Sequence, residues 1–246
     1  MLILLAAVEE ETQLLRQQLD ALEPRQLDGC AVWDGHYGDT PVRLAHSGIG
    51  KAAVAASTIA TLLQTQQADA LWLFGCGGAY LGSGLDIGDL ALANKEIFGD
   101  EGVETPRGFR SLTEMKLPMR QDASQSYYND WPLDPTLQRW ALAQLEHWPQ
   151  RPCQLRSGPF VTLSTCTGRS DRAAEIEART GGICENMEGA AAALACAQHQ
   201  VPMLELRGIS NLVEDRDPSR WNLKAGMDAA QLGVLHLLQQ WREYTP

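Results

Sequence analysis

Apolar runs of strand length alternate with segments of helical periodicity along most of the chain. Leu2–Val8 and Ala70–Phe74 are apolar along their whole length, which predicts two strands. A continuous apolar run, rather than an alternating one, is typical of a strand in a sheet that is covered on both faces. Gly189–His199 and Leu223–Glu243 are expected to be helices that supply such cover. The pattern predicts an α/β fold with a mixed central sheet flanked by helices on both faces.

The other predicted elements extend this alternation along the chain. Helices are expected at 9–22, 51–66, 135–146 and 171–178, and strands at 31–37, 41–46, 89–97, 154–156, 158–163, 182–187 and 203–209. At about 98–134 the hydrophobic residues follow neither helical nor strand periodicity, which predicts an irregular excursion from the domain. Long irregular segments of a compact domain are usually functional. No repeat or linker divides the sequence, so residues 1–246 are expected to form a single domain.

Charge and the apolar start exclude two classes of partner. The chain has 31 acidic residues against 20 lysines and arginines, a formal net charge of −11, and no basic run. Because affinity for phosphate backbones comes from basic residues that displace counterions, no nucleic acid partner is expected. The apolar start is too short to span a bilayer and runs directly into three glutamates, so no membrane partner is expected and the predicted location is cytoplasmic.

Cysteines, histidines and glycines give no sign of a metal or a cofactor. The six cysteines form no CxxC pair and the five histidines are scattered, so we expect reduced thiols and no metal site. Gly75 and Gly77 begin a dinucleotide-binding pattern, but Tyr80 stands where its third glycine would be. Gly50-Lys51 lacks the other residues of a phosphate-binding loop. We therefore expect no cofactor.

Three polar side chains are expected to follow strand ends. Glu11 follows the first strand, Glu188 follows the strand ahead of an alanine-rich helix, and Asn211 follows the next strand. Because ligands of open α/β sheets bind beyond the carboxyl ends of strands, these side chains should meet at one edge of the sheet. An unpaired buried charge is costly, so Glu188 must be solvated or matched by a ligand.

Five motifs resemble, in order and spacing, the nucleoside phosphorylase and nucleosidase superfamily. They are Ala7–Glu11, Ser47–Lys51, Gly75–Gly78, Glu185–Ala190 and Arg207–Asn211. Each motif is weak alone, but the set is specific and covers nearly the whole chain. Residues 98–106 and 215–221 are similar to one hydrolytic branch of that superfamily. The resemblance implies a nucleoside phosphorylase-like fold, an enzyme that cleaves N-glycosidic bonds, and a homo-oligomer.

The same resemblance implies roles for individual residues. Glu11 would orient and deprotonate an attacking water, Glu188 would bind the ribose hydroxyls, and Met187 would pack against the sugar. The ribose and base pocket would be lined by Cys76, Gly77, Phe160 and Val161. Phe160, Val161 and Met187 are equally consistent with ordinary core residues.

Two departures from the superfamily's pattern bear on the reaction. Adenine-releasing nucleosidases have an aspartate where this chain has Asn211. An amide donates one hydrogen bond and accepts another, which matches a 6-oxopurine, so hypoxanthine is the expected leaving base. Some phosphorylases carry an arginine just before the glycine turn, where this chain has the apolar stretch 71–74. With acids filling the turn after the first strand as well, water is the expected nucleophile and a nucleoside is the expected partner.

An anionic substrate on an acidic protein would need a local cation. Arg216, Arg220 and Lys224 follow Asn211 and are the nearest candidates, although Lys224 is as well explained as a solvated helix start. Three alternatives stay open at this point. They are a methylthioadenosine/S-adenosylhomocysteine nucleosidase, a purine nucleoside phosphorylase, and a protein that binds nucleosides without cleaving them.

Overall fold

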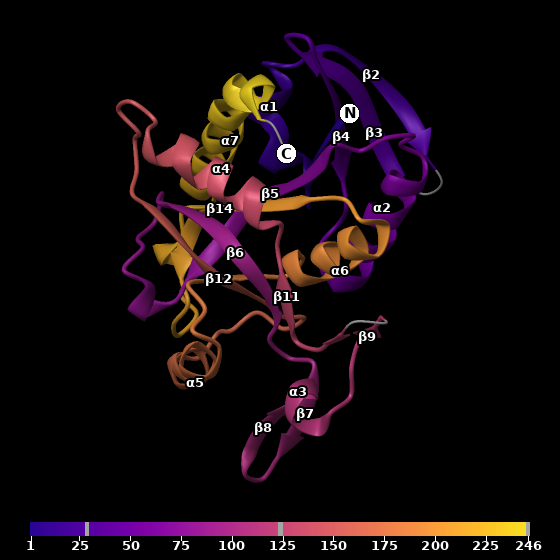
Figure 1. Ribbon diagram of the computed structural model, residues 1–246. Coiled ribbons are helices and arrows are strands. Elements are labelled where there is room, and N and C mark those ends of the chain that lie inside the picture. The colour runs from indigo at the N-terminus through magenta and orange to yellow at the C-terminus, as the bar shows by residue number, and fades with distance from the viewer. Residues whose placement is uncertain (28–29, 123–124, 245–246) are drawn as a thin grey trace.

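A mixed sheet runs through the molecule, and helices cover both of its faces (Figure 1). The computed structural model describes residues 1–27, 30–122 and 125–244, and within them ten strands form this sheet. Its strands are β1 (Leu2–Ala6), β2 (Asp20–Leu27), β3 (Cys30–Tyr37), β4 (Thr40–His46), β5 (Ala70–Ala79), β6 (Leu90–Phe98), β11 (Asp130–Pro132), β12 (Leu155–Thr162), β13 (Cys184–Asn186) and β14 (Met203–Leu212). Their order is β11-β6-β12-β13-β5-β1-β4-β3-β2, with β14 paired to both β5 and β6.

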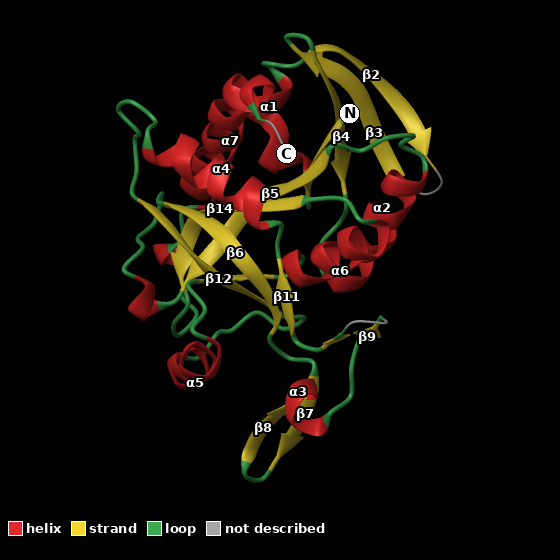
Figure 2. Cartoon of the chain, viewed as in Figure 1, coloured by secondary structure: helices red, strands yellow, loops and turns green. Residues whose placement is uncertain are grey.

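The helices lie in two groups, one on each face of the sheet (Figure 2). One face carries α1 (Gln13–Arg16), α4 (Pro135–Glu146) and α7 (Leu223–Gln240), and the other carries α2 (Lys51–Leu63) and α6 (Gly189–His199). Asp134 caps α4 by accepting hydrogen bonds from the backbone amides of Thr136 (3.0 Å) and Leu137 (2.8 Å), which are otherwise unpaired at a helix start. The remaining helices of the described residues are η1 (Glu9–Thr12), η2 (Leu81–Ser83), α3 (Leu112–Met115), α5 (Ser170–Thr180), η3 (Pro218–Arg220) and η4 (Trp241–Glu243).

Two apolar layers form the core, and successive residues of the strands alternate between them. Leu2 and Leu4 of β1 pack in the layer beneath α4 and α7, whereas Ile3 and Leu5 pack in the layer beneath α2 and α6. Successive side chains of a strand point to opposite faces, so a strand that is buried on both sides must be apolar throughout. The predicted fold class, a mixed sheet between two helical layers, is confirmed.

The direction of the strands around β5 corrects one expectation. β1, β4 and β14 join a parallel set with β5, but β13 runs antiparallel to β5, with Cys184 opposite Ala79. The chain therefore reaches Glu188 from the opposite direction to Glu11 and Asn211. The three side chains do not share one sheet edge; they meet because β5 extends beyond the end of β1 and is joined there by β13.

Two segments differ from their predicted structure. The expected helix over 9–22 is confirmed only in its first half: η1 and α1 are helical as far as Arg16, but Asp20 begins β2, which pairs antiparallel with β3. Hydrogen bonding along β3 outweighs the local helical period there. Within 98–134, β7 (Gly102–Thr105) and β8 (Gly108–Ser111) form a hairpin that projects with α3 from the body of the molecule (Figure 1), and β9 (Arg120–Gln121) pairs with β10 (Ser126–Tyr127).

Candidate active site

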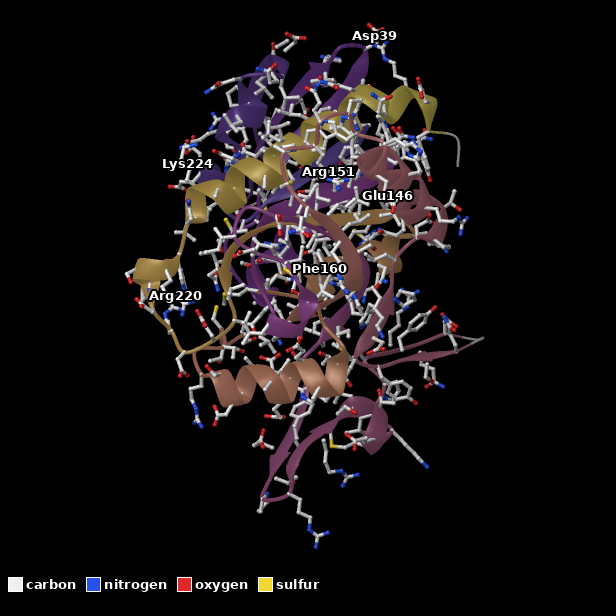
Figure 3. All side chains as sticks on the ribbon, turned by 90° about the vertical axis from the view of Figure 1, so that its left-hand side faces the viewer. Asp39, Glu146, Arg151, Phe160, Arg220 and Lys224 are labelled. Atoms are coloured by element: carbon white, nitrogen blue, oxygen red, sulfur yellow. The ribbon has the colours of Figure 1, made fainter. Side chains whose placement is uncertain are left out.

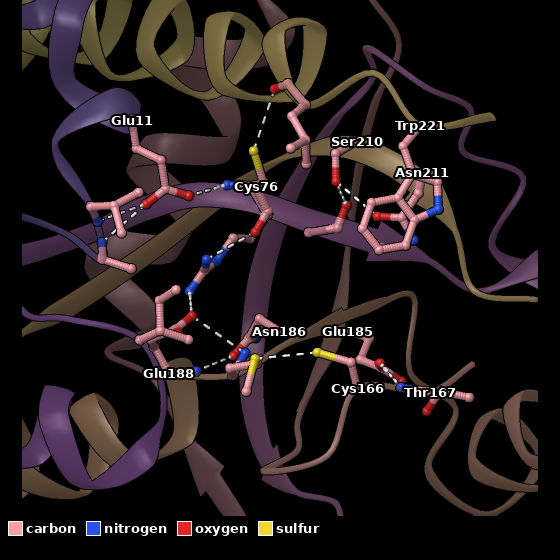
Figure 4. Close-up of a pocket in the computed structure, with 18 of the residues that line it drawn as sticks. Glu11, Cys76, Cys166, Thr167, Glu185, Asn186, Glu188, Ser210, Asn211 and Trp221 are labelled. Atoms are coloured by element: carbon pink, nitrogen blue, oxygen red, sulfur yellow. Dashed lines mark hydrogen bonds and ion pairs between the residues drawn. The ribbon is translucent and has the colours of Figure 1, made fainter. Parts of the chain in front are cut away.

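A cavity of about 310 Å³ opens where β1, β5, β13 and β14 converge (Figure 4). That volume lies within the usual range for small-molecule sites, roughly 300–1,000 Å³. Of the residues predicted for the site, the following line it: Glu11, Cys76, Gly77, Met187, Glu188, Asn211 and Arg216. The motifs at the ends of the first, fifth and last strands and ahead of α6 therefore come together around one hollow.

Glu11 is held by three backbone amides at the end of β1. Its Oε2 accepts hydrogen bonds from the amides of Ala7 (3.0 Å) and Val8 (3.4 Å), and its Oε1 accepts from the amide of Cys76 (2.8 Å). A Cβ at Gly75 would lie 2.3 Å from Oε1, so only glycine leaves room for this carboxyl group. Burial raises the pKa of Glu11, against the opposing effect of Arg207. A fixed carboxylate with a raised pKa suits a general base.

Glu188 is bound from two sides. Its Oε1 accepts a hydrogen bond from the amide of Gly50 (2.9 Å), in the turn before α2, and its Oε2 pairs with Nη2 of Arg207 (3.1 Å). Only 4% of Glu188 is exposed, yet it lines the cavity. The predicted need for a partner is therefore met by Arg207 and the Gly50 turn, and the carboxylate edge that faces the hollow stays available for hydroxyl groups.

Asn211 lies at the irregular end of β14, where the register against β5 shifts after Ile209. Its Oδ1 accepts a hydrogen bond from the hydroxyl of Ser210 (2.8 Å), and its Nδ2 donates to the carbonyl of Leu212 (3.0 Å). An amide has two donor hydrogens and two acceptor positions. One donor and one acceptor therefore stay free for a ligand in the cavity.

Several residues that line the cavity have no role predicted from the sequence. Arg207 and Glu185 are two of them, and each lies within one of the five sequence motifs. Glu185 accepts hydrogen bonds from the amide of Thr167 (2.7 Å) and the hydroxyl of Tyr80 (3.0 Å), so it fixes the loop after β12 against the cavity. Burial raises the pKa of Glu185. Signals for these residues were present in the motifs, but the side chains that face inward could not be told from those that face the core.

The thiol of Cys76 is not suited to act as a nucleophile. Burial, and next the negative charge of Glu11, raise its pKa to about 12. Because the thiolate is the reactive form of cysteine, this side chain is expected to line the cavity as a neutral thiol. Across the cavity, Sγ of Cys166 lies 3.2 Å from Sδ of Met187, so two sulfur-containing side chains form part of the wall (Figure 4).

Arg216 and Arg220 occupy different positions. Arg216 lines the cavity, and its guanidinium lies 4.3 Å from the ring centroid of Trp221, another lining residue. Arg220, in η3, does not line the cavity and pairs with Glu214 (2.7 Å). A contact between Arg220 and the substrate stays a prediction. Lys224 is exposed and pairs with Asp228, as expected for a solvated helix start.

Phe160 and Val161 are not brought to the cavity. Both side chains are fully buried in the apolar core and neither lines the cavity, and Figure 3 shows Phe160 in the interior. The reason is that β12 continues to Thr162, so these two residues sit inside the sheet. Cys166 and Thr167, from the loop that follows, line the cavity in their place. No described residue of 98–134 lines it either.

The described residues contain neither a cluster suited to a metal ion nor a membrane-spanning helix. No group of three or more histidine, cysteine, aspartate or glutamate side chains among them is placed to hold a metal ion. None of the helices in the described part of the chain has the length and apolar character needed to cross a membrane.

Comparison with known proteins gives similarity over nearly the whole chain. A family model described as the phosphorylase superfamily matches residues 2–239. Futalosine hydrolase of Thermus thermophilus is 32% identical over 209 residues, covering 85% of this chain and 86% of that protein. A 5'-methylthioadenosine/S-adenosylhomocysteine nucleosidase of a Geobacillus species is 28% identical over 210 residues, covering 85% and 84%. The solved structure of the corresponding nucleosidase from Neisseria meningitidis, in complex with methylthio-immucillin-A, has a TM-score of 0.82 at 21% identity and covers 97% of this chain and 98% of that one.

Proposed function

Because the chain belongs to the phosphorylase superfamily, we propose that its cavity binds a purine nucleoside and cleaves the N-glycosidic bond with water, and that the nucleoside is futalosine. The products would be hypoxanthine and dehypoxanthine futalosine, and the reaction would serve menaquinone biosynthesis in the cytoplasm. One observation carries this proposal. A carboxylate fixed by backbone amides, Glu11, and an amide with free hydrogen-bonding capacity, Asn211, line the same cavity.

Water is favoured over phosphate as the nucleophile by the charges around Glu11. Among the described lining residues the cations are Arg207 and Arg216. Arg207 already pairs with Glu205 (2.7 Å) and Glu188 (3.1 Å), so its charge is largely offset. A phosphate dianion would meet Glu11 and Glu188 with little compensation. A ribosyl centre that develops positive charge is instead stabilised by nearby carboxylates, as in glycoside hydrolysis.

The identity of the leaving base follows from the hydrogen-bonding capacity of Asn211. Its free Nδ2 hydrogen can bind an oxygen or nitrogen acceptor on the base, and its Oδ1 can accept from a ring N–H. Hypoxanthine offers both kinds of group. A hydrogen bond that strengthens as negative charge grows on the departing base would lower the barrier to bond cleavage.

Arg216 and Trp221 support a substrate with an aromatic carboxylate. Futalosine carries a benzoate at the far end of its side chain. The cavity offers a guanidinium for the carboxylate, and the indole ring of Trp221 lies under that guanidinium and helps to hold it in place. Arginine binds carboxylates through two parallel N–H donors while it stacks on an aromatic ring, so Arg216 supported by Trp221 suits the carboxylate of a benzoate.

Incubation with futalosine, inosine and methylthioadenosine, each with and without phosphate, tests the proposal directly. We expect release of hypoxanthine from futalosine at a rate that does not depend on phosphate. Release of adenine would identify a methylthioadenosine/S-adenosylhomocysteine nucleosidase, and dependence on phosphate would identify a phosphorylase. Tight binding of nucleosides with no base released would show a binding protein instead.

Arg216→Ala should weaken the use of futalosine selectively. A hydrogen bond to a charged group contributes about 1.5–3 kcal/mol, so kcat/KM for futalosine should fall roughly 10–100-fold. Inosine has no carboxylate, and its kcat/KM should change little. Arg220→Ala, which removes a neighbouring arginine that pairs with Glu214 outside the lining, is the matched control. Equal losses for both substrates with Arg216→Ala would show that this arginine does not bind the carboxylate.

We also propose that the protein is a homo-oligomer. Ile49 and Leu223 line the cavity but are 63% and 51% exposed, which leaves apolar side chains open to water at its mouth. A second copy of the chain that covers this mouth would bury them and keep water from the side chain of the substrate. Light scattering of the purified protein measures the number of subunits.

A further inference from the structure

Two glutamates that take no part in the proposed reaction are buried behind the cavity. Glu96 of β6 and Glu205 of β14 are each 0% exposed. Oε2 of each carboxyl group lies beside the same glycine at the start of α6, and each carboxyl group raises or lowers the pKa of the other. An ionised carboxylate without a partner in an apolar interior is very unfavourable, so a fold that keeps two of them must stabilise both.

The start of α6 is shaped around this carboxyl pair. A Cβ at Gly189 would lie 2.1 Å from Oε2 of Glu205 and 2.3 Å from Oε2 of Glu96. The two oxygens therefore converge on one point, which only a glycine leaves open. At so short a separation two carboxylates cannot both be ionised at low cost, because like charges raise each other's pKa. One proton is then held by the pair.

Glu96 is the member that keeps the proton. Burial and then the charge of Glu205 raise its pKa well above the ordinary value. Glu205 is the member that meets the cation: its Oε1 accepts a hydrogen bond from Nε of Arg207 at 2.7 Å. Burial raises the pKa of Glu205 as well, but Arg207 opposes the shift. A protonated Glu96 thus donates to an ionised Glu205.

Arg207 connects this pair to the cavity. Its Nη2 pairs with Glu188 at 3.1 Å, and its Nη1 donates to the carbonyl of Cys76 at 2.9 Å. The amide of the same Cys76 donates to Glu11. One guanidinium therefore joins the buried pair directly to Glu188 and binds the backbone of Cys76, the residue whose amide holds Glu11. Arg207 itself is only 2% exposed.

We infer that Glu96 and Glu205 are positioning residues that hold one proton and one negative charge behind Arg207. That single charge offsets part of the positive charge of Arg207 and fixes the orientation of its guanidinium. Glu188 is thereby held toward the cavity. The positive charge of Arg207 then lowers the pKa of Glu11 less than an unpaired guanidinium would. This inference rests on the proposed function for the roles of Glu11 and Glu188, but the proton of the pair is a property of the folded chain alone.

The negative charge shared by Glu96 and Glu205, and not only their packing, should affect the pKa of the general base Glu11. The charged and titratable groups that face the pair are Arg207 on β14, Cys184 on β13, Glu188 ahead of α6 and, beyond Arg207, Glu11. If Glu96 and Glu205 lost their shared negative charge, the positive charge of Arg207 would no longer be offset, and it would favour the carboxylate form of Glu11. The pKa of Glu11 would fall, and a less basic Glu11 would be a weaker general base.

Two variants separate charge from shape. Glu96→Gln mimics the protonated glutamate, leaves Glu205 ionised and keeps the charge of the pair. The double variant Glu96→Gln/Glu205→Gln has nearly the same shape but no charge. We measure kcat/KM against pH relative to the wild type, with whichever nucleoside the wild type cleaves. The acid limb of that profile reports the pKa of the essential base in the free enzyme.

We expect Glu96→Gln to keep the acid limb where it lies in the wild type. The double variant should move it to lower pH and reduce kcat/KM about tenfold or more at neutral pH, the size of a loss of about 1.4 kcal/mol of transition-state stabilisation. Equal profiles for the two variants would overturn the inference, because a role in packing alone does not depend on charge. A shift caused by Glu96→Gln alone would overturn it too.

Unfolding by urea tests the shared proton without any substrate, even if the double variant does not fold. A raised pKa in the folded state gives stability that is present below the unfolded pKa and is lost as the pH rises toward the folded pKa. Above about pH 5, and up to the pKa of Glu96 in the folded state, the unfolding constant of the wild type should therefore rise with pH more steeply than that of Glu96→Gln, by at most about tenfold per pH unit. Parallel slopes would show that Glu96 holds no proton. Failure of the proposed function would appear separately, as absence of hypoxanthine release by the wild type.

Discussion

Glu11→Gln should lower the rate of hypoxanthine release from futalosine by about 10²–10⁴-fold, the usual contribution of a general base. An amide cannot take a proton from the attacking water. It also fits the site poorly, because one end of the glutamine would direct an N–H group at backbone donors. Those donors are the amides of Ala7 and Val8 on one side and the amide of Cys76 on the other. Single-turnover release of the base measures this effect.

The neighbouring Glu10 offers a matched control for Glu11. It is exposed, so Glu10→Gln makes the same chemical change one residue away without altering the cavity. This variant should keep its rate within a factor of about two, as expected for a surface substitution. Because burial raises the pKa of Glu11, the wild type should also lose kcat/KM on the acid side at a pKa above 4.5. Turnover of Glu11→Gln close to that of the wild type would eliminate the general-base assignment.

Asn211→Asp should change which base the enzyme releases. The carboxyl group can protonate or hydrogen-bond N7 of adenine, whereas it loses the amide donor that suits the carbonyl oxygen of hypoxanthine. An enzyme discriminates strongly against a substrate whose binding leaves a buried polar group without a hydrogen-bond partner. We therefore expect the ratio of kcat/KM for adenosine-type to inosine-type nucleosides to rise about 10²-fold or more.

Paired assays with inosine and adenosine measure that ratio directly. Asn211→Leu is the control, because it removes both hydrogen-bonding groups at similar size and should weaken cleavage of both nucleosides together. Ser210, whose hydroxyl donates to Oδ1 of Asn211, stays in place in each variant and holds residue 211 at the cavity. If Asn211→Asp leaves the ratio of kcat/KM for the two nucleosides unchanged, Asn211 does not determine which base is recognised.

Most of the sheet and its helical cover could be predicted from local pattern. The apolar runs of β1 and β5 indicated strands buried on both sides, and the structure places Leu2 and Ile3 in opposite layers of the core. The helix starting at Gly189 was predicted at its observed bounds. The helical period misled only in the second half of 9–22, because β2 forms by pairing with β3 and no local signal carries that long-range contact.

Motifs predicted the contents of the site better than their arrangement. Glu11, Glu188 and Asn211 were expected near one another and do line one cavity. Phe160 and Val161 lie a few residues before the part of the chain that lines the cavity, because the point at which β12 leaves the sheet depends on its neighbours β6 and β13. Similarly, Arg216 and Arg220 are alike in sequence, but Arg216 lines the cavity whereas Arg220 pairs with Glu214 outside it.

The sequence by itself determined the class of fold, the acids and the amide around the cavity, and the excess of acidic over basic residues. Only the tertiary structure decided how those groups are held. The antiparallel approach of β13 to β5 and the meeting of Glu96 with Glu205 beside Gly189 join residues far apart in the chain. The physical reason is that apolar periodicity is local, whereas the charge and the pKa of a buried carboxyl group depend on every element packed against it.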